Sequence, residues 1–187
     1  MPRRASAGYT LIELLMVVAI LSIVAIIALP VTQRVTESGA DIAVDEVAQM
    51  LRFARDDARR TQEQRLVECD PVTGKVTVKA VDSEKDTSSA STTRTIYRPG
   101  SVPPIAYEVA PGAAPAGSAM NLVSCNFTFV DNATAAAVVF DAAGDPVRGI
   151  GKGPVRDKAL RAGVIVLGAG HIRRSVNLGA TGRITQS

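Results

Sequence analysis

The 187-residue chain is poor in the residue types from which most metal and redox sites are built. It has a single histidine, His171, no tryptophan, and two cysteines that are not spaced as C-x-x-C. Because zinc and most transition-metal sites use clusters of Cys and His, we expect no metal and no cofactor. Aromatic residues make up only 4% of the chain, so its core must consist mainly of Val, Ile, Leu and Ala.

The sequence also lacks the patterns that are typical of an enzyme. No nucleophile stands at a catalytic spacing from a base, and no pair of carboxylates has a plausible pocket context. The glycine-rich run 149–153 precedes Pro154 rather than a helix, so it does not fit a phosphate-binding loop. We therefore expect neither catalysis nor a small-molecule substrate.

What the chain does have is a long apolar segment near its N-terminus. The 21 residues from Tyr9 to Leu29 carry one charge, Glu13, and as a helix they span about 31 Å, the hydrocarbon thickness of a bilayer. Two arginines precede the segment, so its N-terminal side is expected in the cytoplasm. A secretory signal cleaved after the segment is the alternative, which the bulky residues near its end disfavour.

The helical pattern continues beyond Pro30. An apolar stripe with spacings of three and four residues is formed by Val44, Val47, Leu51, Ala54 and Ala58. The charged residues at 52–65 occupy the other positions, with Asp56 and Arg60 four apart, and we expect them to form a solvated face. The pattern predicts one helix from about Thr10 to about Gln64, apolar in its first half and amphipathic in its second.

From Arg65 onward the hydrophobic period changes to two, which predicts strands. They are expected at 65–70 and 75–80, joined by a turn at 71–74, and at 94–98, 105–109, 125–130, 136–141, 163–167 and 171–177. The polar segment 82–93 is expected to be a loop and 111–117 a linker. The fold class is therefore α+β, with one long N-terminal helix packed on an antiparallel β-sheet domain.

The two cysteines lie in predicted strands. Outside the inner membrane the compartment is oxidising, which permits a disulfide between Cys69 and Cys125. Two apolar thiols buried in separate strands are the alternative. The sequence leaves both arrangements open.

Positive charge gathers toward the C-terminus. From Arg148 onward there are eight basic residues against one acidic residue, Asp157. Such a surplus is the footprint of nucleic-acid binding, and basic residues scattered over solvated strands and loops are the alternative. Arg173 and Arg174 are adjacent, so on a strand they point to opposite faces.

The stretch from Gly8 to Leu21, GYTLIELLMVVAIL, resembles the class III signal of type IV pilins and pseudopilins, with Tyr9 where the family usually has Phe. The resemblance implies that a prepilin peptidase cleaves after Gly8 and N-methylates Tyr9. It also implies that Glu13 pairs with the terminal amine of a neighbouring subunit during assembly. That pairing is physically sensible because opposite charges attract strongly in a low dielectric.

The resemblance also divides the chain. It implies a leader peptide at 1–8, a transmembrane helix at 9–29, an amphipathic continuation of that helix at 30–64 and a periplasmic β domain at 65–187. The protein is then expected to cross the inner membrane once, with its N-terminus cytoplasmic and its C-terminal domain periplasmic, before incorporation into a pseudopilus or pilus.

Three motifs in the second part of the chain resemble the GspH/FimT family. Residues 54–60 with 66–69 are similar to its helix-to-strand junction, 139–144 to its glycine turn, and 182–184 to its terminal Gly-Arg motif. The family fold implied by this resemblance is a long N-terminal helix packed on two β-sheets.

The resemblance implies one of two related functions. A GspH-like protein is a minor pseudopilin of a type II secretion system, whose partners are other pseudopilins, the prepilin peptidase and the inner membrane. A FimT/FimU-like protein is a minor type IV pilin that acts in pilus assembly or DNA uptake. For DNA the candidate contacts are Arg173, Arg174 and Arg183, although this chain has Thr185 where the DNA-binding relatives carry a second arginine.

Overall fold

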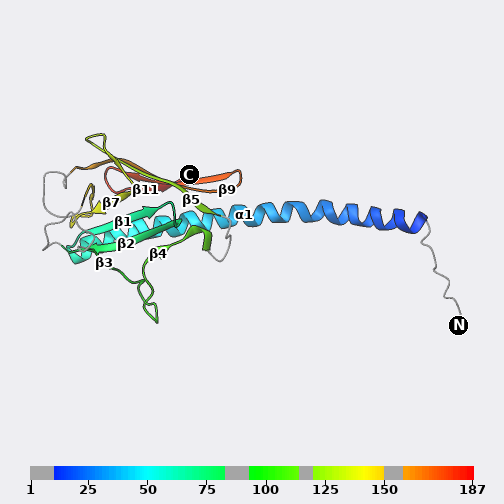
Figure 1. Cartoon of the computed structure of the whole chain (residues 1–187), viewed down its shortest axis with the longest axis horizontal. Coiled ribbons are helices and arrows are strands. Elements are labelled where there is room, and N and C mark those ends of the chain that lie inside the picture. The colour runs from blue at the N-terminus through cyan, green and yellow to red at the C-terminus, as the bar shows by residue number, and fades with distance from the viewer. Residues whose placement is uncertain (1–10, 83–92, 114–119, 150–157) are drawn as a thin grey trace.

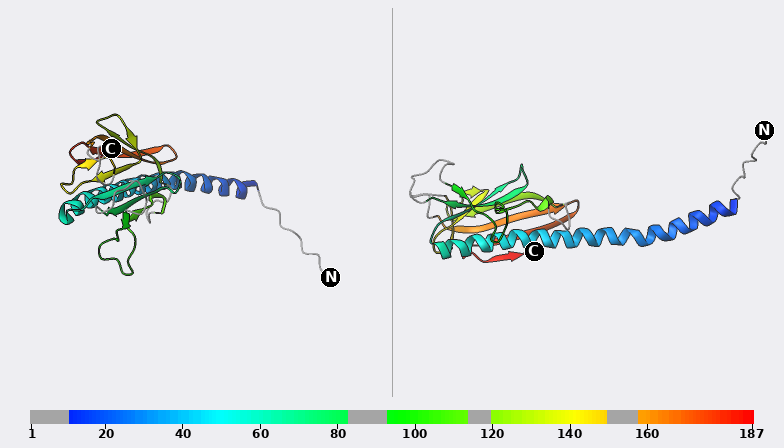
Figure 2. Two further views of the ribbon diagram at one scale, coloured as in Figure 1. Left: turned by 60° about the vertical axis from the view of Figure 1, so that its left-hand side comes forward. Right: turned by 90° about the horizontal axis from the view of Figure 1, so that it is seen from below.

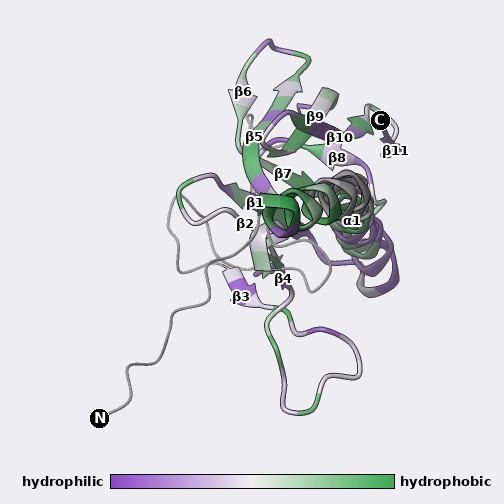
Figure 3. Ribbon diagram, turned by 90° about the vertical axis from the view of Figure 1, so that its right-hand side faces the viewer, coloured by the Kyte–Doolittle hydropathy of each residue, from purple (hydrophilic) through white to green (hydrophobic). Residues whose placement is uncertain are grey.

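The computed structural model describes residues 11–82, 93–113, 120–149 and 158–187, with only the backbone at 23–38. One long helix, α1 (Leu11–Thr61), precedes strands that form two antiparallel sheets. The C-terminal half of α1 lies along the sheets, while its N-terminal half extends beyond them (Figures 1 and 2). Seen along α1, strands of both sheets flank the helix (Figure 3). This arrangement confirms the predicted α+β, pilin-like fold class.

The helix follows the pattern read from the sequence. Its 51 residues, which are about 77 Å long, continue without a break through Pro30 and Gly39. The predicted apolar stripe is buried, since the side chains in it are at most 3% exposed: Val44, Val47, Leu51, Ala54 and Ala58. This burial attaches the second half of α1 to the sheets.

The helix ends at Thr61 for a local reason. Gln62 adopts the left-handed conformation with a φ of 57°, which stops the helical path. Its side-chain amide donates a hydrogen bond of 2.7 Å to the carbonyl of Arg59, one of the carbonyls that lack a partner within the helix.

The first sheet begins directly after the helix. Its strand order is β3-β2-β1-β7-β8, and β4 pairs with β2 on the side that also carries β3. The strands are β1 (Arg65–Asp70), β2 (Lys75–Val81), β3 (Thr93–Thr95), β4 (Glu108–Val109), β7 (Ala137–Phe140) and β8 (Pro146–Val147).

The predicted β1–β2 hairpin is present, and its turn is stabilised by its own side chains. The Asp70 carboxylate accepts hydrogen bonds from the Thr73 hydroxyl at 2.8 Å and from the Val72 amide at 2.9 Å. The hydroxyl and amide of Thr73 and the amide of Val72 hold the pKa of Asp70 below its ordinary value. Gly74 closes the turn with a φ of 67°, which favours glycine.

The second sheet has the strand order β11-β10-β9-β5-β6. A 3₁₀ turn, η2 (Pro111–Ala113), precedes it, and its strands are β5 (Asn121–Phe129), β6 (Thr134–Ala135), β9 (Leu160–Ala169), β10 (Ile172–Gly179) and β11 (Ile184–Gln186). Three of the few aromatic residues, Phe127, Phe129 and Phe140, are fully buried in the core. The rest of the core is aliphatic, together with Met50, Met120 and Cys69.

Several predicted boundaries are wrong. The strand expected at 94–98 is the three-residue β3 followed by an isolated bridge between Tyr97 and Ala106, and β5 begins four residues before the predicted strand at 125–130. The described part of the expected linker 111–117 is the 3₁₀ turn η2. The strands β6, β8 and β11 were not predicted, because two or three residues are too few to display a period of two.

Candidate functional site

The N-terminal part of α1 is an uncovered apolar surface. Nine large apolar side chains between Leu11 and Leu21 are 52–83% exposed, and within the described residues no sheet or loop covers them. Glu13 lies among them in the first turn of the helix, where a carboxylate is favoured by the helix dipole. Gly8 and Tyr9 lie outside the described residues, so cleavage and methylation there stay predictions.

No helix in the described parts of the chain combines the length and the hydropathy required of a membrane span.

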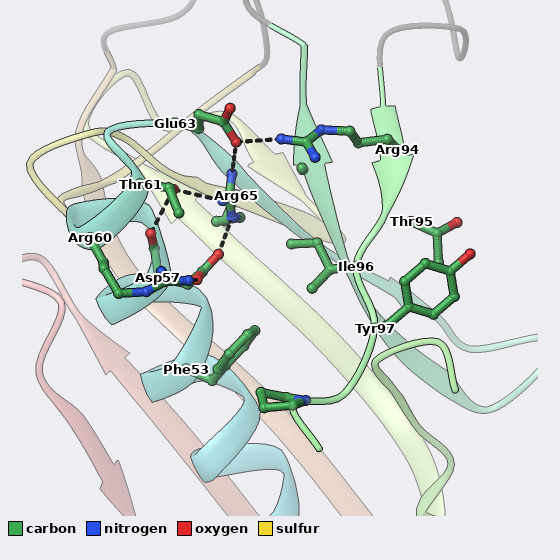
Figure 4. A pocket seen from close by; sticks show the side chains of 12 residues that line it. Phe53, Asp57, Arg60, Thr61, Glu63, Arg65, Arg94, Thr95, Ile96 and Tyr97 are labelled. Atoms are coloured by element: carbon green, nitrogen blue, oxygen red, sulfur yellow. Dashed lines mark hydrogen bonds and ion pairs between the residues drawn. The ribbon is translucent and has the colours of Figure 1, made fainter. Parts of the chain in front are cut away.

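Most charged residues at the end of α1 are exposed, as the sequence suggests, but Asp57 and Arg65 are buried and form the centre of a cluster of ion pairs. The side chains of Asp57 and Arg65 are only 7% and 4% exposed, and Arg65 Nε donates to Asp57 Oδ2 at 2.6 Å. Arg60 Nη2 donates to the other carboxylate oxygen at 2.5 Å, so Arg60 pairs with Asp57 and not with Asp56 as its spacing suggests. Figure 4 shows these side chains converging from α1 and β1.

The cluster continues from the helix to the edge of the first sheet. Arg65 Nη2 donates to the hydroxyl of Thr61 at 2.6 Å, and Arg65 Nη1 donates to Glu63 at 3.0 Å. Glu63 also accepts a hydrogen bond of 2.6 Å from Arg94 on β3. Positive and negative groups therefore alternate along one wall of a hollow of about 430 Å³ between α1 and β3 (Figure 4).

The charge state of Asp57 is set by two opposing effects. Burial alone raises the pKa of this carboxyl, because it disfavours the charged form. The hydrogen bonds and positive charges of Arg65 and Arg60 outweigh burial and hold the pKa of Asp57 below its ordinary value. Asp57 is thus ionised at neutral pH, and the buried Arg65 keeps its counter-charge.

The three GspH/FimT-like motifs, which are far apart in sequence, meet at the same end of α1. Arg59 Nε donates to the carbonyl of Ala143 at 2.7 Å, in the turn between β7 and β8. Arg55 Nη1 donates to the carbonyl of Gly182 at 3.0 Å, in the turn between β10 and β11. One helix face therefore holds a turn from each sheet.

Gly144 is required at this junction for both its conformation and its size. Its φ is 80°, and a Cβ added there would lie 2.8 Å from Cγ and 2.9 Å from Cδ of Arg59. We expect Gly144→Ala to lower the free energy of unfolding by about 2–3 kcal/mol, since it adds backbone strain and displaces Arg59 from the Ala143 carbonyl. Urea unfolding followed by circular dichroism measures this loss.

Gly74→Ala is the matched control for that variant. Gly74 has a φ of 67° but no neighbour within 4 Å of an added Cβ, so only backbone strain of about 1 kcal/mol is expected. Equal losses for the two variants would contradict the role assigned to the contact with Arg59.

The structure joins Cys69 and Cys125 in a disulfide, with an S–S distance of 2.07 Å and a Cα–Cα distance of 6.2 Å. Cys69 lies on β1 and Cys125 on β5, so the bond links the two sheets covalently. The arrangement of two separate thiols, which the sequence left open, is not the one found.

The candidate DNA-contacting arginines do not form one patch. Arg173 is exposed, whereas Arg174 points to the other face of β10 and donates to Asp41 of α1 at 3.1 Å. Arg183 is also exposed but lies opposite Gly179, six residues along β10 from Arg173, which corresponds to about 20 Å. Lys152 and Arg156, which contribute to the basic surplus, lie outside the described residues.

The N-terminal segment matches a known sequence motif, and the fold resembles known structures. Residues 3–29 match the family model described as the prokaryotic N-terminal methylation motif. Two structures of the minor pseudopilin EpsH from the type 2 secretion system of Vibrio cholerae have a similar fold, with TM-scores of 0.52 and 0.50 and identities of 9% and 10%. The similarity covers 80% and 79% of this chain and 96% and 95% of those chains.

The type IV minor pilin FimU of Pseudomonas aeruginosa aligns with a TM-score of 0.45 and 12% identity, over 81% of this chain and 90% of its own. No curated protein matches the sequence.

The chain therefore combines an N-terminal methylation motif with a long helix packed on two sheets, the fold that it shares with the EpsH structures. The two EpsH structures are those of a minor pseudopilin.

Proposed function

We propose that the chain is a GspH-like minor pseudopilin, a structural subunit of the periplasmic pseudopilus in a type II secretion system. The observation that carries the proposal is the uncovered apolar surface from Leu11 to Leu21, which lies within the methylation motif matched at residues 3–29 and contains the single carboxylate of Glu13. An exposed apolar surface of this extent needs a lipid or protein environment to cover it. The fold shared with EpsH supports the choice of a pseudopilin.

In this proposal the apolar part of α1 has two successive environments. Before assembly it anchors the chain in the inner membrane, with the N-terminus cytoplasmic and the β domain periplasmic. After a prepilin peptidase has cleaved behind Gly8 and methylated Tyr9, the same surface packs against the helices of neighbouring subunits. Glu13 then pairs with the terminal amine of a neighbour, because a lone carboxylate in an apolar environment is costly.

Glu13→Ala is expected to reduce incorporation of the full-length chain into filaments at least tenfold, with an unchanged amount in the membrane. The reason is that the substitution removes the charge pair while leaving every described contact of the β domain in place. Immunoblotting of sheared filament and membrane fractions measures both quantities. Ser22→Ala is the matched control, because the Ser22 hydroxyl donates to the Val18 carbonyl of its own helix at 2.8 Å. Equal incorporation of the two variants would refute the role of Glu13.

Deleting the gene distinguishes the two related functions. A pseudopilin predicts loss of exoprotein secretion with normal surface piliation. Loss of piliation with normal secretion would instead support a FimU-like minor pilin. Loss of transformation alone would favour DNA uptake, for which Arg173, Arg174 and Arg183 are the candidate contacts.

A further inference from the structure

The chain between β3 and β4 projects from the domain as a finger, defined here as residues 98–105. It extends away from both sheets and from the axis of α1 in Figure 1, in the left view of Figure 2 and in Figure 3. Its tip is apolar and open to solvent: Val102 is 93% exposed and Ile105 is 54% exposed, and Pro103 and Pro104 are exposed between them. Exposure of apolar side chains to water is unfavourable, so an exposed apolar tip suggests a binding surface for another molecule.

The finger is held in one conformation by its own hydrogen bonds. At its base the Arg98 amide donates to the Ile105 carbonyl at 2.8 Å. Within it, the Ser101 hydroxyl donates to the Arg98 carbonyl at 2.8 Å and accepts from the Ile105 amide at 3.1 Å. Three prolines in eight residues further restrict the backbone.

The base of the finger is also attached to the helix. Arg98 Nη2 donates to Glu46 on α1 at 2.9 Å and to the Glu108 carbonyl at 2.7 Å. The Arg98 guanidinium lies 5.5 Å from the ring centre of Tyr107, which in turn packs on Phe53 of α1 with 4.5 Å between centres. Because the tip is ordered before binding, docking costs it little conformational entropy.

A membrane is a poor candidate for the partner. Glu46, which braces the finger, lies 17 residues along α1 from Leu29, the end of the proposed transmembrane segment, and this corresponds to about 26 Å. A bilayer that covers residues 9–29 therefore does not extend to the finger. The partner is more simply a protein that lies beside the β domain.

The size of the finger indicates what kind of protein its partner is. A stable interface uses about 20–30 residues from each partner, and the finger offers eight. It is too small to hold a dimer by itself, but it suffices for a contact between molecules that are already held side by side. Neighbouring subunits of a filament, joined through their helices, meet that condition.

We propose that the tip of the finger docks into an apolar recess on the β domain of a neighbouring pilin-like subunit in the same filament. The proposal rests on the proposed function, since it needs a filament. It assigns to Val102 and Ile105 the role of apolar anchors, and to Arg98 and Ser101 the role of keeping them in position.

The test compares two single substitutions in the full-length chain. Val102→Lys places a charge at the tip, and Val72→Lys places the same charge at a side chain that is 96% exposed in the β1–β2 turn, outside the finger. We expect Val102→Lys to lower incorporation into sheared filaments at least tenfold and Val72→Lys to change it less than twofold, with equal thermal unfolding midpoints. If the wild type enters filaments and both variants do so equally, the docking is refuted while the proposed function stands. If the wild type is absent from filaments, both fail.

A photo-crosslinking amino acid at position 102, with position 72 as the control, identifies the partner directly. With the probe at position 102, we expect a cross-link between this chain and a second pilin-like subunit. With the probe at position 72, we expect no such cross-link. A product that contains lipid alone, or equal subunit products from both positions, would overturn the proposal.

Discussion

Asp57→Ala is expected to lower the free energy of unfolding by about 3–5 kcal/mol, because it leaves the guanidinium of Arg65 buried without its counter-charge. The Arg65 side chain is 4% exposed, so water cannot replace the lost carboxylate without opening the junction between α1 and β1. Urea unfolding of residues 30–187, followed by circular dichroism, measures the loss. The unfolding midpoint should fall without a change in slope.

The adjacent Asp56 provides the matched control. Its side chain is 61% exposed and accepts a hydrogen bond from Arg55 at 2.9 Å, and exposed pairs of this kind contribute about 0–1 kcal/mol. Asp56→Ala should therefore be nearly neutral. If the two substitutions lower the free energy of unfolding equally, Asp57 is solvated and the buried ion pair with Arg65 does not stabilise the junction.

The same pair has a defined pH dependence. Because the pKa of Asp57 is lowered in the folded chain, its contribution to stability is complete above its unfolded pKa of about 3.9 and is lost as the pH falls through the lower folded pKa. The difference in stability between the wild type and Asp57→Ala should therefore shrink below about pH 4. A difference that is independent of pH down to pH 2 would show that the carboxylate charge is not what stabilises the junction.

Removing the disulfide is expected to cost about 4 kcal/mol. Cys69 and Cys125 are 56 residues apart in sequence, and the loss of a cross-link that closes a loop of this length gives about that value in the chain-entropy model. In this model the loss arises because the unfolded chain gains conformational entropy when the bond between β1 and β5 is removed. Chemical unfolding of Cys69→Ala/Cys125→Ala under oxidising conditions measures it.

A reductant supplies the control for this prediction. It should lower the stability of the wild type toward that of the double variant and leave the double variant unchanged. A wild type that is insensitive to a reductant able to reach unfolded thiols would contradict the expected contribution of the bond.

The features that could be predicted from the sequence are those encoded by neighbouring residues. The stripe from Val44 to Ala58 displays the helical period, and the alternation on both sides of 71–74 displays a hairpin. The N-terminal motif is also contiguous, so it can be recognised without any knowledge of the fold. The α+β class follows from these local patterns.

The junction at the end of α1 could not be predicted, because its partners are distant in sequence. Arg55 and the Gly182 carbonyl are 127 residues apart, and Arg59 and the Ala143 carbonyl are 84 apart. Composition and period also do not distinguish a charged residue that faces water from one that is buried with a partner. Asp57 was therefore assigned to a solvated face, although it is the most buried acidic residue in the described chain. Its proximity to Arg65, just after the end of the helix, was the one available signal.

The junction at the end of α1 has a mechanical consequence. Within the last two turns of the helix, Arg55 holds the β10–β11 turn, Arg59 holds the β7–β8 turn, and Asp57 holds β1 through Arg65. A force along the helix axis is therefore transmitted to both sheets through three separate attachments. The disulfide between β1 and β5 resists sliding of one sheet past the other. The β domain moves with its helix as one stiff body under axial load.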